Sequence, residues 1–156
     1  MIPVHMIPLL GLVLLLSGCG GGVNRQVPEG VWPWAPAEVE FHQLSRFLER
    51  DGVEILSLRI EFRDAEGDPV KFPGTVIIEV SPQNTLDESW TFTFDLSDLK
   101  TNASFWDHVT STYRFELEID WDDPPLPNTE IMVRISADSP ETGLLSNSIS
   151  TWRGGN

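Results

Sequence analysis

Residues 113–121 read YRFELEIDW, and this stretch decides the fold class. Aromatic or aliphatic side chains occupy every second position, and Arg, Glu and Asp occupy the positions between them. Successive side chains of a β-strand point to opposite faces, so this alternation predicts a strand with one face in a core and one in water. Residues 56–62 and 90–96 show the same period of two. Strands of this kind are typical of antiparallel sheets that have one solvated face.

Further alternation brings the predicted number of strands to about seven. The additional segments are residues 39–47, 76–80, 131–135 and 144–152. Between the segments the chain is rich in Asp, Asn, Gly and Pro, which turns prefer. Apart from an apolar run near the N-terminus, no segment of ten or more residues keeps a helical period. Residues 102–108, in the long link between two strands, are expected to form a short helical turn.

These patterns together predict an all-β fold. Many strands with one apolar face, frequent turns and no alternating helices favour two packed antiparallel sheets. We therefore expect a two-sheet antiparallel β-sandwich with Greek-key connections, of the Ig-like or transthyretin-like type. The apolar stripes are expected to form the inner faces, with Trp90 and Trp121 in the core.

The composition limits the partners that the protein can have. The chain of 156 residues contains 24 Asp and Glu against 10 Lys and Arg, a formal net charge of −14. Phosphate groups repel such a surface, so we expect no nucleic-acid partner. Cys19 is the only cysteine, and the chain therefore forms no internal disulfide and depends on its core for stability.

The N-terminal apolar run, residues 6–16, indicates export. It is uncharged but shorter than the roughly 20 residues that span a bilayer as a helix. It ends in Leu16-Ser17-Gly18-Cys19, which resembles the lipobox of bacterial lipoproteins: a branched apolar residue, two small residues and a cysteine. The segment before the run departs from that family's pattern, because residues 1–5 contain no Lys or Arg.

The lipobox resemblance implies a location and a domain organisation. Signal cleavage is expected between Gly18 and Cys19, with lipid attached to the Cys19 thiol and the protein held on a membrane of the bacterial envelope. Gly20 rather than Asp follows the cysteine, which in the enteric family rule implies the outer membrane. The expected parts are a signal peptide (1–18), the lipidated cysteine with a Gly, Pro and Trp tether (19–37), a β-sandwich domain (38–153) and a short tail (154–156).

A second resemblance covers residues 58–80, LRIEFRDAEGDPVKFPGTVIIEV. The segment is similar to the first hairpin of transthyretin-like and carboxypeptidase-regulatory-like domains, in which a strand ends in Asp and a Gly-containing turn, Pro-Val and a second strand follow. The corresponding residues are Asp64, Gly67, Pro69-Val70 and Gly74. The resemblance implies a non-enzymatic accessory or adhesion module. The chain also resembles uncharacterised planctomycete-type lipoproteins through residues 97–102, which implies no function.

Two groups of residues are candidates for ligand binding. Asp64, Glu66 and Asp68 place carboxylates at alternate positions around a glycine, a spacing that can surround calcium with oxygen ligands. Carboxylates in turns also keep an acidic protein soluble, and this second interpretation stays open. Trp106, in the link between strands, and Trp152, near the end, are candidates for stacking on a sugar ring, against the alternative that they pack at a sandwich edge.

No catalytic set emerges from the sequence. After signal removal the histidines are His42 and His108, and no zinc, phosphate-binding or serine-nucleophile motif accompanies them. We therefore assign no catalytic residue and no required cofactor. The expected function is that of a non-catalytic, lipid-anchored interaction, scaffolding or assembly module that binds an envelope protein, with a sheet edge as the docking surface. The alternatives are a calcium-dependent or carbohydrate-binding module and, third, a hydrolase that uses a carboxylate pair.

Overall fold

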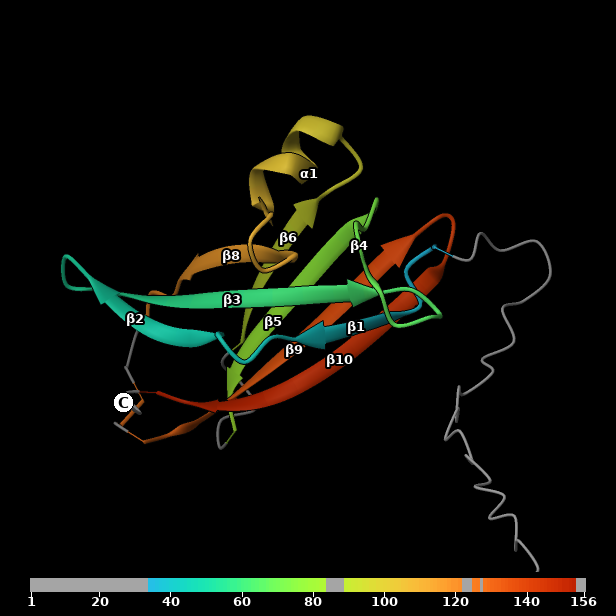
Figure 1. The fold of residues 1–156 in the computed structure, drawn as a ribbon. Coiled ribbons are helices and arrows are strands. Elements are labelled where there is room, and N and C mark those ends of the chain that lie inside the picture. The colour runs from blue at the N-terminus through green and yellow to red at the C-terminus, as the bar shows by residue number, and fades with distance from the viewer. Residues whose placement is uncertain (1–33, 84–88, 122–124, 127, 154–156) are drawn as a thin grey trace, which may run out of the picture.

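A computed structural model describes residues 34–83, 89–121, 125–126 and 128–153 of the chain, and these residues form two antiparallel sheets packed face to face (Figure 1). The six-stranded sheet contains β1 (Glu38–Phe41), β2 (Arg46–Arg50), β3 (Val53–Arg63), β4 (Pro69–Val70), β7 (Trp106–Asp107) and β8 (Thr112–Glu118). The four-stranded sheet contains β5 (Thr75–Pro82), β6 (Trp90–Asp95), β9 (Glu130–Ser139) and β10 (Gly143–Trp152). One helix, α1 (Leu99–Phe105), lies between β6 and β7.

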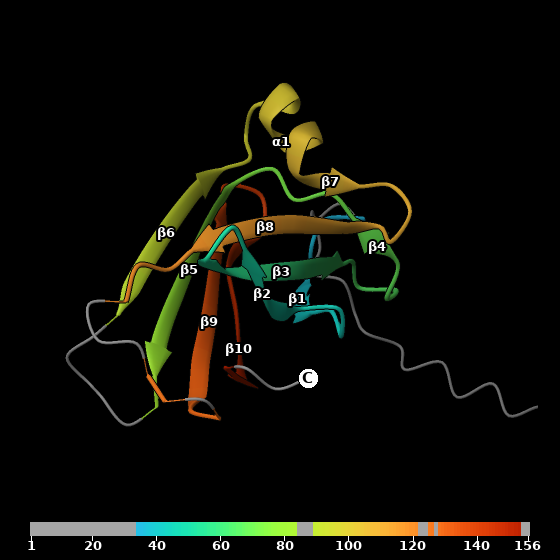
Figure 2. The same ribbon diagram turned by 90° about the vertical axis from the view of Figure 1, so that its left-hand side faces the viewer.

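The connections between the sheets follow an Ig-like Greek key. In the six-stranded sheet the order is β1-β3-β8-β7, with β2 and β4 also paired to β3, and in the other sheet it is β10-β9-β5-β6. The chain crosses from one sheet to the other after β4, after β6 and after β8 (Figure 2). The prediction of an all-β, two-sheet antiparallel sandwich is therefore confirmed, and each predicted segment contains a strand.

The first predicted strand, residues 39–47, is divided in two. β1 and β2 both pair with β3, but a turn in which the Ser45 amide donates to the His42 carbonyl separates them. The Ser45 hydroxyl donates to the Arg59 carbonyl at 3.2 Å and accepts from the Arg59 amide at 3.0 Å. The Arg59 carbonyl also accepts from the His42 amide, so the Ser45 hydroxyl supplies the acceptor that the Arg59 amide lacks at the break.

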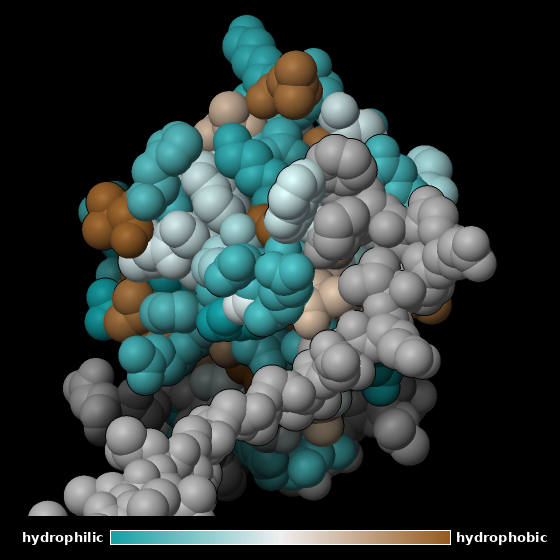
Figure 3. Space-filling model, turned by 45° about the vertical axis from the view of Figure 1, so that its right-hand side comes forward, coloured by the Kyte–Doolittle hydropathy of each residue, from teal (hydrophilic) through white to brown (hydrophobic). Residues whose placement is uncertain are grey.

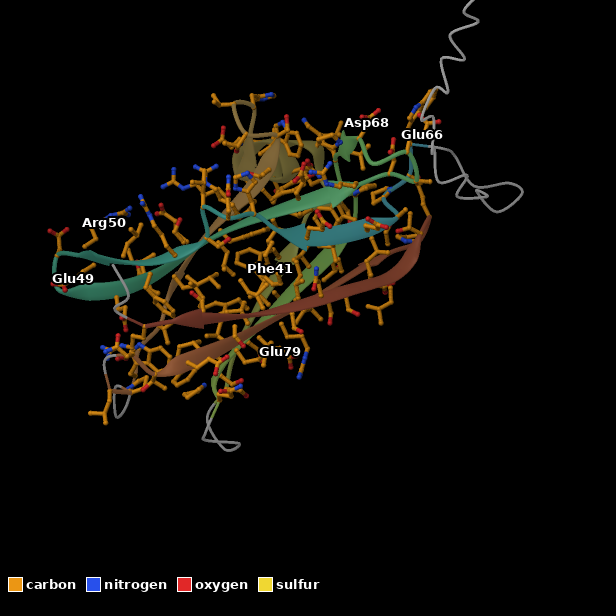
Figure 4. All side chains as sticks on the ribbon, turned by 60° about the horizontal axis from the view of Figure 1, so that its bottom comes forward. Phe41, Glu49, Arg50, Glu66, Asp68 and Glu79 are labelled. Carbon is orange, nitrogen blue, oxygen red and sulfur yellow. The ribbon has the colours of Figure 1, made fainter. Side chains whose placement is uncertain are left out.

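The inward positions of both sheets form one core. Phe62 stacks on Phe72 with ring centroids 4.4 Å apart, and Phe115 lies 4.5 Å from Phe94 and 5.1 Å from Phe105 of α1. Figure 4 shows Phe41 directed between the two sheets, whereas Glu79 of β5 points away from them. The fully buried large side chains are Tyr113, Phe62, Phe72, Phe115, Leu56, Leu58, Ile60, Ile78, Leu96, Leu117, Ile131 and Ile135.

Helix α1 begins at Leu99, three residues before the helical turn that the sequence predicts. Its N-cap is Asp98, whose carboxylate accepts from the Thr101 amide at 2.8 Å and so satisfies one of the free donors of the first turn. Asn102 is the buried residue of the helix. Its amide donates to the Phe72 and Leu96 carbonyls and accepts from the Tyr113 hydroxyl, each at 2.9 Å.

The crossing from β3 to β5 explains the glycine at position 74. β4 pairs with β3 only at Phe62 with Val70 and Arg63 with Pro69, and the chain then enters the other sheet. A Cβ atom on Gly74 would meet the Asp138 carbonyl oxygen and would lie 2.8 Å from the Phe72 ring. Glycine is therefore required here because the backbone passes so close to β9 and the core.

The two ends of the described chain lie at opposite ends of β3. The Ala37 amide donates to the Arg63 carbonyl at the end of β3, whereas Arg153 bonds the Glu54 side chain at its beginning. Glu54 and Arg63 are nine residue steps apart along β3, which corresponds to roughly 30 Å. Among the described helices, none is long and apolar enough to cross a membrane.

Candidate functional site

Asp64, Glu66 and Asp68 form a turn rather than a gathered set of ligands. One Asp64 oxygen accepts from the Glu66 and Asp68 amides, both at 2.9 Å, and the aspartate is fully buried. Glu66 and Asp68 are exposed at the same end of the molecule (Figure 4). In the part of the chain that the structure describes, no three His, Cys, Asp or Glu side chains come together as a metal site. The local role of Asp64 is therefore to shape the turn between β3 and β4.

Several predicted residues lie outside the described part. Gly18 and Cys19, where cleavage and lipidation are predicted, precede residue 34, and the side chain of Trp152 is also outside it. Trp106 is described, and it is half-buried in β7 against the core. The structure therefore locates one of the two tryptophans that the sequence singles out for ligand binding.

A hollow of about 560 Å³ is lined in part by Trp106, and we call it the Trp106 hollow. It lies where α1 leads into β7, with outward side chains of β8 on its other side. The residues that line it are Ser104, Phe105, Trp106, Asp107, His108, Arg114 and Glu116. Trp106 makes edge-to-face contacts with Tyr113 and His108, and the Lys71 ammonium lies 5.5 Å from the centre of its ring.

Both carboxylates of the Trp106 hollow are held by arginines. Glu116 accepts from Arg50 at 3.1 Å and from Arg114, and these hydrogen bonds lower the pKa of Glu116. Asp107 accepts from Arg59 at 2.5 Å and from the Val109 amide at 2.9 Å. The Arg59 bond, followed by the Val109 bond, lowers the pKa of Asp107 from 3.8 to about 2. Both side chains are therefore charged at neutral pH.

The Asp107–Arg59 pair should make stability depend on pH in the acid range. Because the pKa of Asp107 is lower in the folded state than its usual 3.8, its contribution is complete above that value and is lost as the pH falls towards about 2. The Asp107→Asn variant should be less stable than the wild type at pH 7, and this difference should shrink between pH 4 and pH 2. Urea unfolding at a series of pH values measures it. With the exposed Asp138→Asn variant as control, a difference that stays constant across this range would contradict the prediction.

A second hollow, of about 520 Å³, lies at the opposite end of the sandwich from the Asp64 turn. Glu54 accepts there from the Trp121 indole and from Arg153, both at 2.7 Å, and Trp90 packs edge-to-face against Trp121. Arg153 also donates to the Pro125 carbonyl. Both hydrogen bonds go to one oxygen of the Glu54 carboxylate, and they join the end of β10 to β3. Trp90 and Trp121 are both only half-buried, so the core position expected for them is instead a position at the rim of the core.

Strand β10 has one unpaired edge. It pairs with β9 over all ten residues and with no other strand of the described chain. The Arg153 amide donates to the Thr129 carbonyl just beyond this ladder, so the backbone groups of Arg153 face β9. Counting back from Arg153 shows which residues of β10 face β9 and which face the free edge. The amide and carbonyl groups of Ser148, Ser150 and Trp152 therefore point to the free edge, because neighbouring residues in an antiparallel ladder alternate between the two sides.

Asn147 bridges the free edges of the two sheets. Its side-chain amide donates to the Val39 carbonyl of β1 at 2.8 Å, and its oxygen accepts from the Ser148 amide at 2.7 Å. A groove of about 480 Å³ separates the two strands here, lined by residues 37–40 and 145–147. We call this pair of hydrogen bonds the Asn147 bridge. It occupies one backbone group on each edge without pairing the strands.

Comparison with known proteins adds nothing to what these surfaces show. No protein-family model matches the chain, and no curated protein matches it with significant similarity. Sequence reasoning pointed to Trp106 but did not single out Asn147, Arg114 or Glu54, whose roles depend on partners far away in the sequence.

Proposed function

We propose that the protein is a non-catalytic, lipid-anchored interaction module of the bacterial envelope, and that it binds an extended segment of an envelope protein along β10. The observation that carries the proposal is the free edge of β10. Its sequence, GLLSNSISTW, contains no charged residue and no proline over ten residues. Natural sheets usually protect an exposed edge with charges, proline or short length, and an edge without them is suited to strand addition.

The other described edges are less suitable. β4 and β7 have two residues each, β1 contains Glu38 and Glu40, and β2 contains three charged residues. β6 is an edge of the same sheet as β10, but it has six residues and ends in Asp95. Ser146, Ser148 and Ser150 have small, exposed side chains on this strand, and β1 lies beside residues 145–147.

Charges placed on the β10 edge should abolish partner binding. The double variant Ser148→Lys, Ser150→Lys adds two cations beside the free backbone groups, and added strands avoid such edges. The matched control, Thr91→Lys with Thr93→Lys, places the same charges on exposed positions of the edge strand β6. The lipidated protein serves as bait in a pull-down from envelope membranes, with Cys19→Ser as the unlipidated control. We expect the wild type and the β6 variant to recover one envelope protein in stoichiometric amount, and the β10 variant to recover at least tenfold less.

Three results would overturn this proposal. The first is equal recovery by the β6 and β10 variants, which would place the contact elsewhere. The second is a wild-type bait that returns alone. The third is a wild-type dimer in size-exclusion chromatography that the β10 charges convert to a monomer, since the occupant of the edge would then be a second copy of the chain. The β6 and β10 double lysine variants should unfold at the same urea concentrations as the wild type, because their new side chains are exposed.

A further inference from the structure

One side of the sandwich is closed by a helix. Helix α1 lies between the edge strands β6 and β7, and the centroid of its Phe105 ring is 5.3 Å from that of Phe94 in β6 and 5.1 Å from that of Phe115 in β8. The opposite side lies between β10 and the edge formed by β1 and β2, where β1 runs beside β10. No helix or strand of the described chain covers this side, and we call it the open side of the sandwich (Figure 4).

Apolar side chains lie half-buried along the open side. Phe41 of β1, Phe47 of β2 and Ile149 of β10 pack against the core, but none of them is fully buried. A strand added to β10 would direct alternate side chains to the inner face of its sheet, beside Ile149 and towards Phe41 across the opening. Because burial of apolar area is favourable there, the open side suits a segment with apolar residues at alternate positions.

Strand β1 limits the part of β10 with which a segment can pair. The groove between the two strands is lined by residues 37–40 and 145–147, and the Ser148 amide already donates to the Asn147 side chain at 2.7 Å. Beyond the groove, the Ser148 carbonyl and the amides and carbonyls of Ser150 and Trp152 face the free edge. A paired segment therefore lies beside residues 148–152, and its end nearest Asn147 meets the groove.

The β1 side of this groove carries an excess of negative charge. Glu40 and Glu61 stand directly opposite each other in the ladder between β1 and β3, which is unfavourable for like charges, and both bind Arg63, at 3.3 and 2.9 Å. Arg59, the preceding arginine of β3, is engaged by Asp107 of β7. One cation thus serves two carboxylates, and the Glu40 side chain is 51% exposed.

From these observations we infer that the segment bound along β10 is amphipathic and basic. Its alternate apolar side chains enter the open side against Ile149, and a Lys or Arg at the end nearest Asn147 forms an ion pair with Glu40. The long apolar stem of Lys or Arg allows its charged group to reach across the groove. The formal net charge of −14 also favours a basic partner over an acidic one. This inference rests on the proposed function, since it describes the segment that β10 binds.

Short peptides test the chemistry of the segment directly. The full chain lacking its export segment, made as Cys19→Ser, is titrated with Lys-Val-Thr-Val-Thr-Val, with the peptide in which Glu replaces Lys and with the peptide in which Thr replaces Val, and binding is followed by NMR of the backbone amides. We expect the lysine peptide to shift the signals of residues 148–152 and to bind at least fivefold more tightly than the glutamate peptide, a difference that shrinks as salt is added. The threonine peptide should bind at least tenfold more weakly than the lysine peptide. Equal binding of the three peptides, or a lysine peptide that leaves these signals unchanged, would overturn the inference.

Matched glutamate variants of the bait separate this inference from the proposed function. Glu40→Lys should lower recovery of the envelope partner at least fivefold, whereas Glu79→Lys, at a side chain that is 43% exposed and paired with Arg134 on the other sheet, should not. Urea unfolding checks that both variants remain folded. Equal recovery by the two, while the β10 double lysine variant still abolishes binding, would overturn the inference and leave the proposed function standing. Slow hydrogen exchange of the Ser150 amide in the free protein would show that residues 19–33 or a second copy occupies the edge, and would overturn both.

Discussion

Replacing Asn102 with alanine is expected to lower the free energy of unfolding by about 3 kcal/mol. Among the described residues, its amide is the only side-chain partner of the Phe72 and Leu96 carbonyls, and it also accepts from the Tyr113 hydroxyl. Each buried polar group left without a partner costs about 1–3 kcal/mol. Alanine favours helix more than asparagine does, so the change in helix propensity opposes the loss and cannot cause it.

Equilibrium unfolding in urea measures this effect. Lys100→Ala serves as control, because it changes an exposed residue of the same helix to the same side chain. A companion variant, Tyr113→Phe, removes the hydroxyl that accepts from the Phe72 amide and donates to Asn102. Because the two side chains belong to one network, their effects should not add in the double variant. A loss below 1 kcal/mol for Asn102→Ala would show that the network contributes little.

The Phe115→Ala variant is expected to lose about 3–5 kcal/mol of stability. Phe115 is fully buried in β8, and its ring lies against Phe94 of β6 and Phe105 of α1, so its removal leaves a cavity between both sheets and the helix. Such a loss is a large part of the stability of a single domain, and the variant should unfold at much lower urea concentrations.

The control for this variant is Leu144→Ala, which removes an apolar side chain that is 68% exposed. Its effect should stay within about 0.5 kcal/mol. The dependence of the unfolding free energy on urea should remain that of the wild type in both variants, since the surface exposed on unfolding hardly changes. A Phe115→Ala protein as stable as the control would contradict the position of this ring in the core.

The two-residue period predicted the sandwich because burial on one face of each strand imposes that period directly. It failed at strand ends. β8 stops at Glu118, yet the alternation continues to Trp121, because Ile119 remains buried and its amide still donates to the Glu54 carbonyl in register with the β3–β8 ladder. The break between β1 and β2 was equally hidden, since the Ser45 hydroxyl that accepts from the Arg59 amide there is not part of any hydrophobic pattern.

The candidate sites were less accessible to sequence reasoning. Trp106 could be singled out because an aromatic side chain in a link between strands is conspicuous. The side chains that line the hollow with it come from α1, β7, β8 and the turn between the two strands, and only the ladder between β3 and β8 places Arg114 opposite Arg59. Asn147 acts on Val39, 108 positions away. Its role follows from two strand edges meeting across the sandwich, which no local pattern records.

The surface seen in Figure 3 is mainly hydrophilic, with hydrophobic side chains in small separate groups. Apolar contact between neighbouring copies on that face is therefore weak. The free edge of β10 is the surface most prone to self-association. The Asn147 bridge opposes pairing at this edge, because it already occupies a backbone group of β10. A strand that pairs with β10 beside Asn147 must replace the hydrogen bond between the Asn147 oxygen and the Ser148 amide, and it gains only what it forms in excess of that bond. Brief, poorly aligned encounters between crowded molecules thus bring no net gain, whereas a segment matched over several residues does.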